Sequence, residues 1–142
     1  MKLLLAIDDS KYSEAAVQAV ITNHKKEGLE ARVLHVIEPP VSLTPPEVAV
    51  FVPPRESEED AQALVAKAVS ALGSAGINAK TSVMHGEAKS IIVDYAKGFE
   101  ADLIVLGSHG RKGIDRFLVG SVSEAVLRHA PCSVEIVRLP VH

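Results

Sequence analysis

The residues with the clearest chemical potential lie between positions 107 and 121. Glycine stands at Gly107, Gly110 and Gly120, and Ser121 follows the last of these. Glycine lets backbone N–H groups approach a phosphate closely, and the N-terminus of a helix adds unpaired donors and a dipole that favours anions. The segment therefore has the composition of a phosphate cradle. On spacing alone, a tight turn followed by a helix cap at Ser121 is an equally good interpretation.

Two familiar nucleotide-binding motifs do not fit. A P-loop requires Gly-Lys-Ser/Thr, whereas Lys112 is followed by Gly113. The dinucleotide fingerprint requires two glycines one residue apart after the first strand, where this chain has Asp8, Asp9 and Ser10. Asp8 could accept a hydrogen bond from a ribose hydroxyl or an adenine amino group. Alternatively it belongs to the turn, while Asp9 or Ser10 caps the first helix.

The elements that must position these residues follow a β-α pattern. Short apolar runs rich in β-branched residues alternate with amphipathic stretches, as expected for a parallel sheet covered by helices. Right-handed crossovers then favour an α/β fold, a doubly wound sheet with helices on both faces. The five runs span Lys2 to Ile7, Ala31 to Ile37, Asn78 to Met84, Asp102 to Leu106 and Ser133 to Arg138.

The first and fourth runs are apolar throughout, which is typical of adjacent central strands. Ligands of open α/β sheets bind beyond the carboxyl ends of the strands, so Asp8 and the Gly107 loop are expected to face one site. Gly28, Gly73 and Gly98 follow the first three helical patterns, where a left-handed cap is common.

A proline-rich excursion interrupts the pattern. Six of the eight prolines fall between Glu38 and Arg55, and an apolar run from Val48 to Val52 lies in their midst. Ser57 with Asp60 then resembles a capping box that starts the next helix. We expect the apolar run to pack on a partner subunit or over a ligand, or else to be a mobile surface excursion.

Composition excludes several function classes. The 142 residues fit a single domain covering residues 1–142, with a net charge of −3, few aromatics and no Trp, which argues against nucleic-acid binding. Cys132 is the sole cysteine, so no intrachain disulfide is possible. The apolar stretch from Met1 to Ile7 is too short for a signal peptide or a membrane span. A cytoplasmic protein without membrane association is the expectation.

The basic residues near the glycines are His109, Arg111, Lys112 and Arg116. They could contact a γ-phosphate or its metal, or form a solvated loop, and Arg111 is the one we assign to the phosphates. The six histidines show no i,i+4 pair, so we expect no zinc site. Mg²⁺ would be bound by the phosphates of the nucleotide, with water as most of its other ligands. Cys132 is expected to be a small buried hydrophobe, and no catalytic residue is assigned.

Gly107-x-x-Gly110, nine further residues and Gly120-Ser121 resemble the nucleotide-binding signature of the universal stress protein family. The resemblance covers nearly the whole chain. It extends to the segments Leu4 to Ser10, Leu34 to Ile37, Asp102 to Gly107 and Ala130 to Val134. It implies a Rossmann-like five-stranded parallel sheet in the order 3-2-1-4-5 and membership of the branch that binds ATP.

The same resemblance implies roles for individual residues. By position, Asp8 would meet the adenosine, and Val36 would present backbone groups to the adenine edge. Gly107, Gly110, Gly120 and Ser121 would surround the ribose and phosphates. Val122 would add a backbone donor.

The family resemblance also implies a homodimer formed by pairing the last strands, and an exposed edge at Val134 to Val137 would suit such pairing. The alternative is a monomer whose edge is blunted by Glu135 and the tail at Pro140. The expected function is that of an ATP-binding regulatory stress-response protein. The alternatives are a slow ATPase or adenylyl-transferring enzyme assisted by Asp8 or His109, and a nucleotide-independent interaction module.

Overall fold

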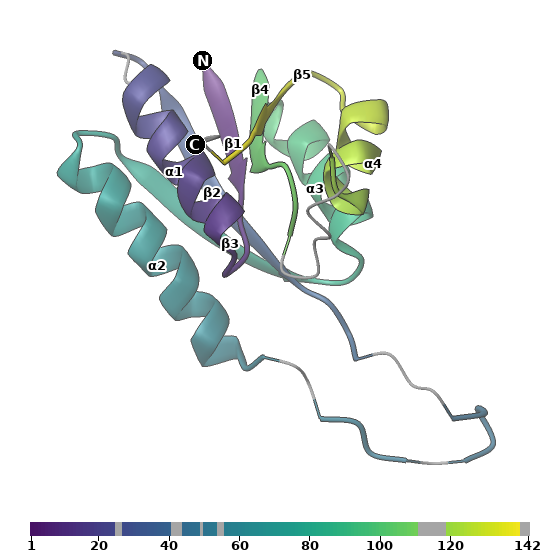
Figure 1. Ribbon diagram of the computed structural model, residues 1–142. Helices are drawn as coiled ribbons and strands as arrows, with labels where there is room; N and C mark the ends of the chain where they lie inside the picture. Colours follow the sequence, from purple (N-terminus) through teal and green to yellow (C-terminus); the bar gives the residue numbers. More distant parts are fainter. Residues whose placement is uncertain (25–26, 41–43, 49, 54–55, 111–118, 140–142) are drawn as a thin grey trace.

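The structure is a computed structural model that describes residues 1–24, 27–40, 44–48, 50–53, 56–110 and 119–139. Within these ranges the chain forms a five-stranded parallel sheet in the order β3-β2-β1-β4-β5 (Figure 1). The strands are β1 (Lys2–Ala6), β2 (Glu30–Ile37), β3 (Ala79–His85), β4 (Leu103–Gly107) and β5 (Ser133–Val137). The expected α/β class and strand order are confirmed, and the strand ends shift by only a residue or two.

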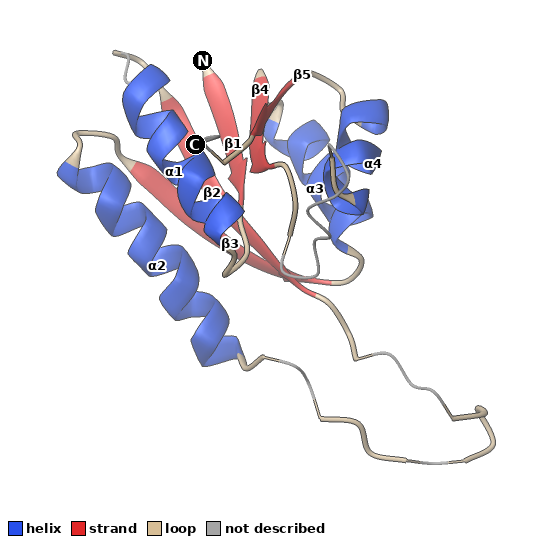
Figure 2. Cartoon of the chain, viewed as in Figure 1, coloured by secondary structure: helices blue, strands red, loops and turns tan. Residues whose placement is uncertain are grey.

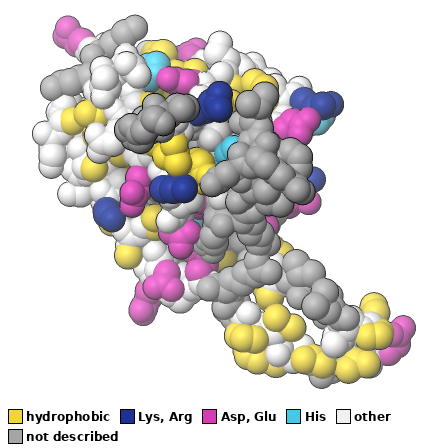
Figure 3. Space-filling model, viewed as in Figure 1, with side chains coloured by type: hydrophobic (Ala, Val, Ile, Leu, Met, Phe, Trp, Pro, Cys, Tyr) yellow, Lys and Arg dark blue, Asp and Glu magenta, His cyan; other side chains and the backbone are white. Residues whose placement is uncertain are grey.

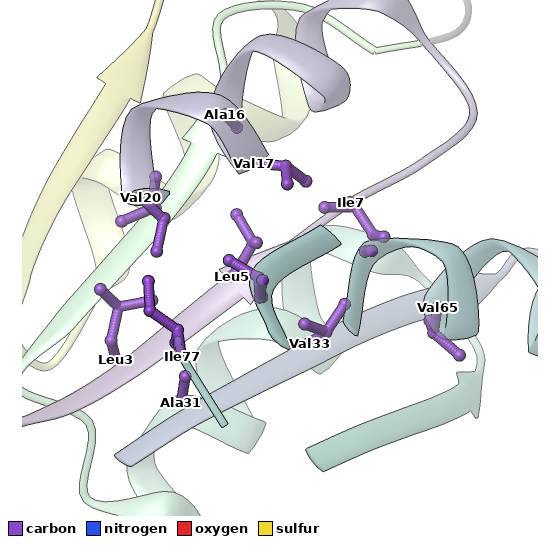
Figure 4. Packing of buried hydrophobic residues seen from close by; sticks show 13 residues of the cluster. Leu3, Leu5, Ile7, Ala16, Val17, Val20, Ala31, Val33, Val65 and Ile77 are labelled. Carbon is purple, nitrogen blue, oxygen red and sulfur yellow. The ribbon is translucent and has the colours of Figure 1, made fainter. Parts of the chain in front are cut away.

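Helices cover both faces of this sheet (Figure 2). They are α1 (Lys11–Asn23), α2 (Glu58–Ser74), α3 (Ala88–Phe99) and α4 (Ser121–His129). One apolar cluster packs α1 and α2 against the sheet, and a second packs α3 and α4 against the opposite face. Figure 4 shows the first cluster, in which Leu3, Leu5 and Val33 meet Val17 and Val20 of α1.

The centre of the sheet is β1 paired with β4, as their uninterrupted apolar sequences predict. Leu4 aligns with Ile104 and Leu5 with Val105, and all four side chains are fully buried. Because both strands are parallel, their carboxyl ends meet at the same edge. The residues that follow them are thereby brought to one place.

Two of the expected helix caps are wrong. Gly73 lies inside α2 and Gly98 inside α3, while the left-handed backbone falls at Gly76 (φ 85°) and Glu100 (φ 57°). In α3 the apolar stripe continues past Gly98 to the buried Phe99, so packing on the sheet holds the helix together beyond its glycine. Gly28, after α1, does have a positive φ of 80°.

The capping box of Ser57 and Asp60 is confirmed, since each side chain accepts from the other residue's backbone N–H. Before it, the described parts of the excursion extend away from the sheet (Figure 1). Val48, Val50 and Phe51 are exposed, with Phe51 at 86%. In the space-filling view, hydrophobic side chains gather on the part of the chain that extends away from the sheet (Figure 3). They do not cover the site within this chain.

No helix in the described part of the chain has both the length and the apolar character needed to cross a membrane.

Candidate functional site

A pocket of about 570 Å³ lies at the carboxyl ends of the strands, between the starts of α3 and α4. This volume is within the range of about 300 to 1,000 Å³ that is usual for small-molecule sites. Arg111 falls outside the described residues. The other seven predicted site residues all line the pocket: Asp8, Val36, Gly107, Gly110, Gly120, Ser121 and Val122.

Asp8 is held in place by the start of α1. Its Oδ1 accepts hydrogen bonds from the Ser10 backbone N–H and from the Ser13 hydroxyl, both at 2.9 Å. Ser10 is the N-cap of α1, since its side chain accepts from the Ser13 N–H. Asp8 therefore belongs to the turn and lines the pocket at the same time. Its Oδ2 faces Gly110, where an added Cβ would lie 2.9 Å away.

Gly107 is required by close packing. A Cβ at this position would lie 2.7 Å from Cβ of Tyr12 and 2.8 Å from the Tyr12 carbonyl carbon and oxygen. On its other side, the Gly107 carbonyl accepts a 2.7 Å hydrogen bond from the buried Ser123 hydroxyl. The end of β4 is therefore fixed between α1 and α4.

The start of α4 forms the opposite wall of the pocket. Gly120 is its N-cap, with extended backbone and no side-chain hydrogen bond, and Ser121 is the first helical residue rather than the cap. The Gly120 N–H donates to the Ser108 carbonyl at 2.6 Å. Because glycine has no side chain to accept from the first turn, this helix start presents backbone donors and the positive end of its dipole to the pocket.

His109 is buried, contrary to the solvated loop considered for it. The residue is 8% exposed, its ring centroid lies 5.1 Å from that of Tyr12, and its Nδ1 lies 3.0 Å from the Ser108 hydroxyl oxygen. Lys112 and Arg116 fall outside the described residues. Among the described side chains, no group of three His, Cys, Asp or Glu residues is arranged to hold a metal ion.

The sequence did not single out the acidic residues of the pocket. Glu56 lies 2.7 Å from Nε2 of the buried His35, and Glu38 accepts from the Ala88 N–H at the start of α3 at 3.2 Å. Both glutamates line the pocket, as does Lys89. Glu56 is 21 residues from His35 in the sequence, so no local sequence pattern predicts the pair.

Cys132 is half-buried, packs against the second apolar cluster and is not among the residues that line the pocket. Burial raises the pKa of its thiol, the charge of Asp102 raises that pKa further, and a backbone hydrogen bond at Ile104 opposes both. A raised pKa leaves less thiolate, which agrees with the expected role as a small hydrophobe.

Comparison with known proteins agrees with this geometry. Residues 1–138 match the family model described as the universal stress protein family. A putative universal stress protein of Staphylococcus epidermidis is 33% identical over 140 residues, which cover 96% of this chain and 82% of the relative.

Two solved structures share the fold. One is a universal stress protein in complex with cAMP, with a TM-score of 0.72, 21% identity and coverage of 96% of this chain and 95% of the other. The second is an Arabidopsis thaliana family protein with AMP bound, with a TM-score of 0.69, 17% identity and coverage of 99% and 93%. From the family match and the relative at 33% identity, this chain belongs to the universal stress protein family.

Proposed function

We propose that the chain is a single nucleotide-binding domain that holds ATP in the pocket and acts as a regulatory stress-response protein of the cytoplasm. The observation that carries the proposal is the start of α4, which faces the pocket without a side-chain cap. Open donors and a helix dipole of this kind favour phosphate. The AMP- and cAMP-bound family members support an adenine nucleotide as the ligand.

In this proposal the two ends of the pocket bind different parts of the nucleotide. The carboxylate of Asp8 accepts from the adenosine, and the backbone of Val36 meets the adenine edge. The backbone N–H groups of Ser121 and Val122 bind phosphate oxygens, and the Ser121 hydroxyl adds a donor. Further members of the site are Gly107, Gly110, Gly120 and Arg111.

Mg²⁺ fits this site only when it is bound to the phosphates of the nucleotide. The described residues contain no three-ligand cluster, and Mg²⁺ retains several waters when it binds through phosphates. Asp8 is one of the carboxylates that line the pocket, and its Oδ1 already accepts two hydrogen bonds. Mg²⁺ would therefore be held by phosphate oxygens and water.

We also propose that two chains associate through β5. This strand is at the edge of the sheet, where unpaired backbone groups can receive a second strand. Glu135 does not point outward to block that edge, because its Oε2 lies 2.6 Å from His24 Nε2 at the end of α1. Sedimentation equilibrium at micromolar concentration tests the association, and a mass of 15.1 kDa would refute it.

Isothermal titration with ATP, AMP and GTP tests nucleotide binding itself. Ser121→Pro sharpens the test, because proline suits the first position of a helix but lacks the N–H that would bind phosphate. Losing one hydrogen bond to a charged group costs about 1.5 to 3 kcal/mol, so the ATP Kd should rise about tenfold or more.

Two controls isolate that backbone donor. Ser121→Ala removes the hydroxyl alone and should cost less affinity than Ser121→Pro. Glu58→Pro places proline at the first position of α2, outside the pocket, and should leave ATP affinity unchanged. If the wild type binds none of the three nucleotides at millimolar concentration, the proposal is wrong. Equal affinity in Ser121→Pro and Ser121→Ala would refute the assigned donor.

A further inference from the structure

The side chain of Glu38 joins the end of β2 to the start of α3. Its Oε1 accepts a hydrogen bond of 3.2 Å from the backbone N–H of Ala88, the first residue of α3. The N-cap residue Glu87 makes no side-chain hydrogen bond to this turn of backbone, and its Oε1 accepts from the Ser90 hydroxyl at 2.8 Å. Glu38, 50 residues before Ala88, therefore supplies an acceptor that the start of α3 needs.

One oxygen of the Glu38 carboxylate is left for a ligand. Within the described ranges of the chain, the Ala88 N–H is the only group that hydrogen-bonds to Glu38, and it uses Oε1. The Glu38 side chain is exposed and lines the pocket. A carboxylate can accept hydrogen bonds but cannot donate them. Oε2 is therefore an acceptor at the pocket wall.

Glu38 lies close to the backbone groups that we assign to the adenine edge. The Leu34 carbonyl accepts from the N–H of Ile7, directly after β1. In parallel strands alternate residues bond to the same neighbouring strand, so Val36 directs its N–H and C=O to this side, where β1 has ended. Val36 and Glu38 are two residues apart, about 7 Å in an extended chain, so one base can meet both.

We propose that Glu38 selects adenine over 6-oxopurines by accepting a hydrogen bond from the adenine amino group. This inference rests on the proposed function. The amino group at position 6 of adenine offers two hydrogens, one for the Val36 carbonyl and one for Oε2 of Glu38. Guanine and hypoxanthine carry a carbonyl oxygen at that position, which would face the lone pairs of both acceptors. A polar site discriminates against a ligand that leaves its groups unpaired.

Glu38→Gln should reverse the hydrogen bonding of this side chain, because the start of α3 determines its orientation. The Ala88 N–H requires an acceptor, so the amide oxygen takes the place of Oε1. The amide NH₂ then takes the place of Oε2 and presents donors to the pocket. A donor at this point suits the carbonyl of a 6-oxopurine and opposes the amino group of adenine.

The test compares ATP with inosine triphosphate (ITP), whose base is hypoxanthine, by isothermal titration of the wild type and E38Q. The wild type should bind ATP more tightly than ITP. In E38Q the Kd of ATP should rise about tenfold, as expected for loss of a hydrogen bond to a charged group, and the Kd of ITP should fall. The ratio of the ITP Kd to the ATP Kd therefore decreases by about tenfold or more. Val36 contributes equally in both proteins, so the change in ratio reports on Glu38.

Two further variants separate this hydrogen bond from other effects. Glu87→Gln also removes one negative charge from the pocket wall and keeps an acceptor for the Ser90 hydroxyl, so it should retain the wild-type ratio. Glu38→Ala removes the acceptor without adding a donor. Its ratio should lie between those of the wild type and E38Q.

The orientation of the glutamine is tested without nucleotide. Urea unfolding of E38Q should give an equilibrium constant within about twofold of the wild type, because the amide oxygen still caps α3. Glu38→Ala should raise that constant about fivefold, a usual effect of losing a cap. If E38Q were as unstable as Glu38→Ala, the cap would not orient the side chain and the proposal would be wrong.

The outcomes distinguish the selectivity from the proposed function. If the wild type binds neither ATP nor ITP at millimolar concentration, nucleotide binding fails and the selectivity fails with it. If the wild type binds ATP but E38Q keeps the same ratio, the proposed function stands and the role of Glu38 is refuted. An equal decrease of the ratio in Glu87→Gln would also refute that role, since charge alone would then explain the preference.

Discussion

Gly107→Ala should destabilise the protein strongly although it adds one methyl group. The new Cβ would lie 2.7 to 2.8 Å from three Tyr12 atoms, two of which are backbone atoms. Backbone cannot turn away as the end of a flexible side chain can, so α1 must move relative to β4. Overpacking of a well-ordered core costs about 1 to 3 kcal/mol, and contact with backbone places this variant near the upper end.

We therefore expect a loss of about 2 to 3 kcal/mol in the free energy of unfolding, measured by urea denaturation. For a chain of this length the melting temperature should fall by about 6 to 12 °C. Gly73→Ala is the matched control, since Gly73 is inside α2 and an added Cβ meets no atom within 4 Å. It should gain about 0.5 to 1 kcal/mol from higher helix propensity.

The comparison of the two alanine variants can refute this reasoning. If Gly107→Ala were as stable as the wild type within about 0.5 kcal/mol, the close approach of Tyr12 could not be the reason for glycine at this position. A loss of the same size in Gly73→Ala would show that alanine is harmful for some other reason than overlap. In either case the packing role assigned to Gly107 would be abandoned.

Three further predictions concern single side chains. Ser123→Ala leaves the buried Gly107 carbonyl without its donor and should cost about 1 to 3 kcal/mol in urea unfolding, whereas Ser123→Thr, which keeps the hydroxyl, should cost less. Ser57→Ala removes one half of the capping box and should cost about 1 kcal/mol, with Ser57→Asp close to the wild type in the same assay. Burial raises the pKa of the Cys132 thiol, and Asp102 adds to the shift, so the thiolate is scarce at neutral pH. Its reaction with a disulfide reagent at pH 7.5 should be slower than that of glutathione and should accelerate as the pH rises, and a rate equal to that of glutathione would contradict the shift.

The sequence predicts the sheet well because its two central strands have no alternative environment. Leu3 to Leu5 and Ile104 to Val105 are apolar on both faces, and only a strand covered by helices on each side buries both. The order of the strands, by contrast, was implied only by the resemblance to the universal stress protein family. Helix ends were predicted less well. The burial of Phe99 extends α3 beyond Gly98, whereas α2 ends only one residue after Gly73.

The residues of the site also differ in whether the sequence predicts them. Asp8 and Val36 line the pocket because they follow or end parallel strands, a consequence of topology that a sequence can reveal. The hydrogen-bonded pair of His35 and Glu56 joins residues on either side of the proline-rich excursion, and it depends on where that excursion returns. No periodicity encodes that return, so the pair could not be predicted.

The glycines of the signature do not carry equal weight as evidence for nucleotide binding. Gly107 is already explained by the nearby Tyr12 backbone, so it would be needed in a protein with the same fold and no ligand. At Gly110 an added Cβ would meet only Oδ2 of Asp8, the end of a side chain, at 2.9 Å. At Gly120 an added Cβ would meet backbone atoms of His109 and Ser108 at 3.1 and 3.2 Å, so this glycine also has a packing role. Serine or aspartate at that cap would stabilise α4 by only a few tenths of a kcal/mol more than glycine does. Because loss of a glycine in this signature also disturbs packing, Ser121→Pro, which removes one backbone donor at a helix start that lines the pocket, is a sharper test of function than loss of any glycine.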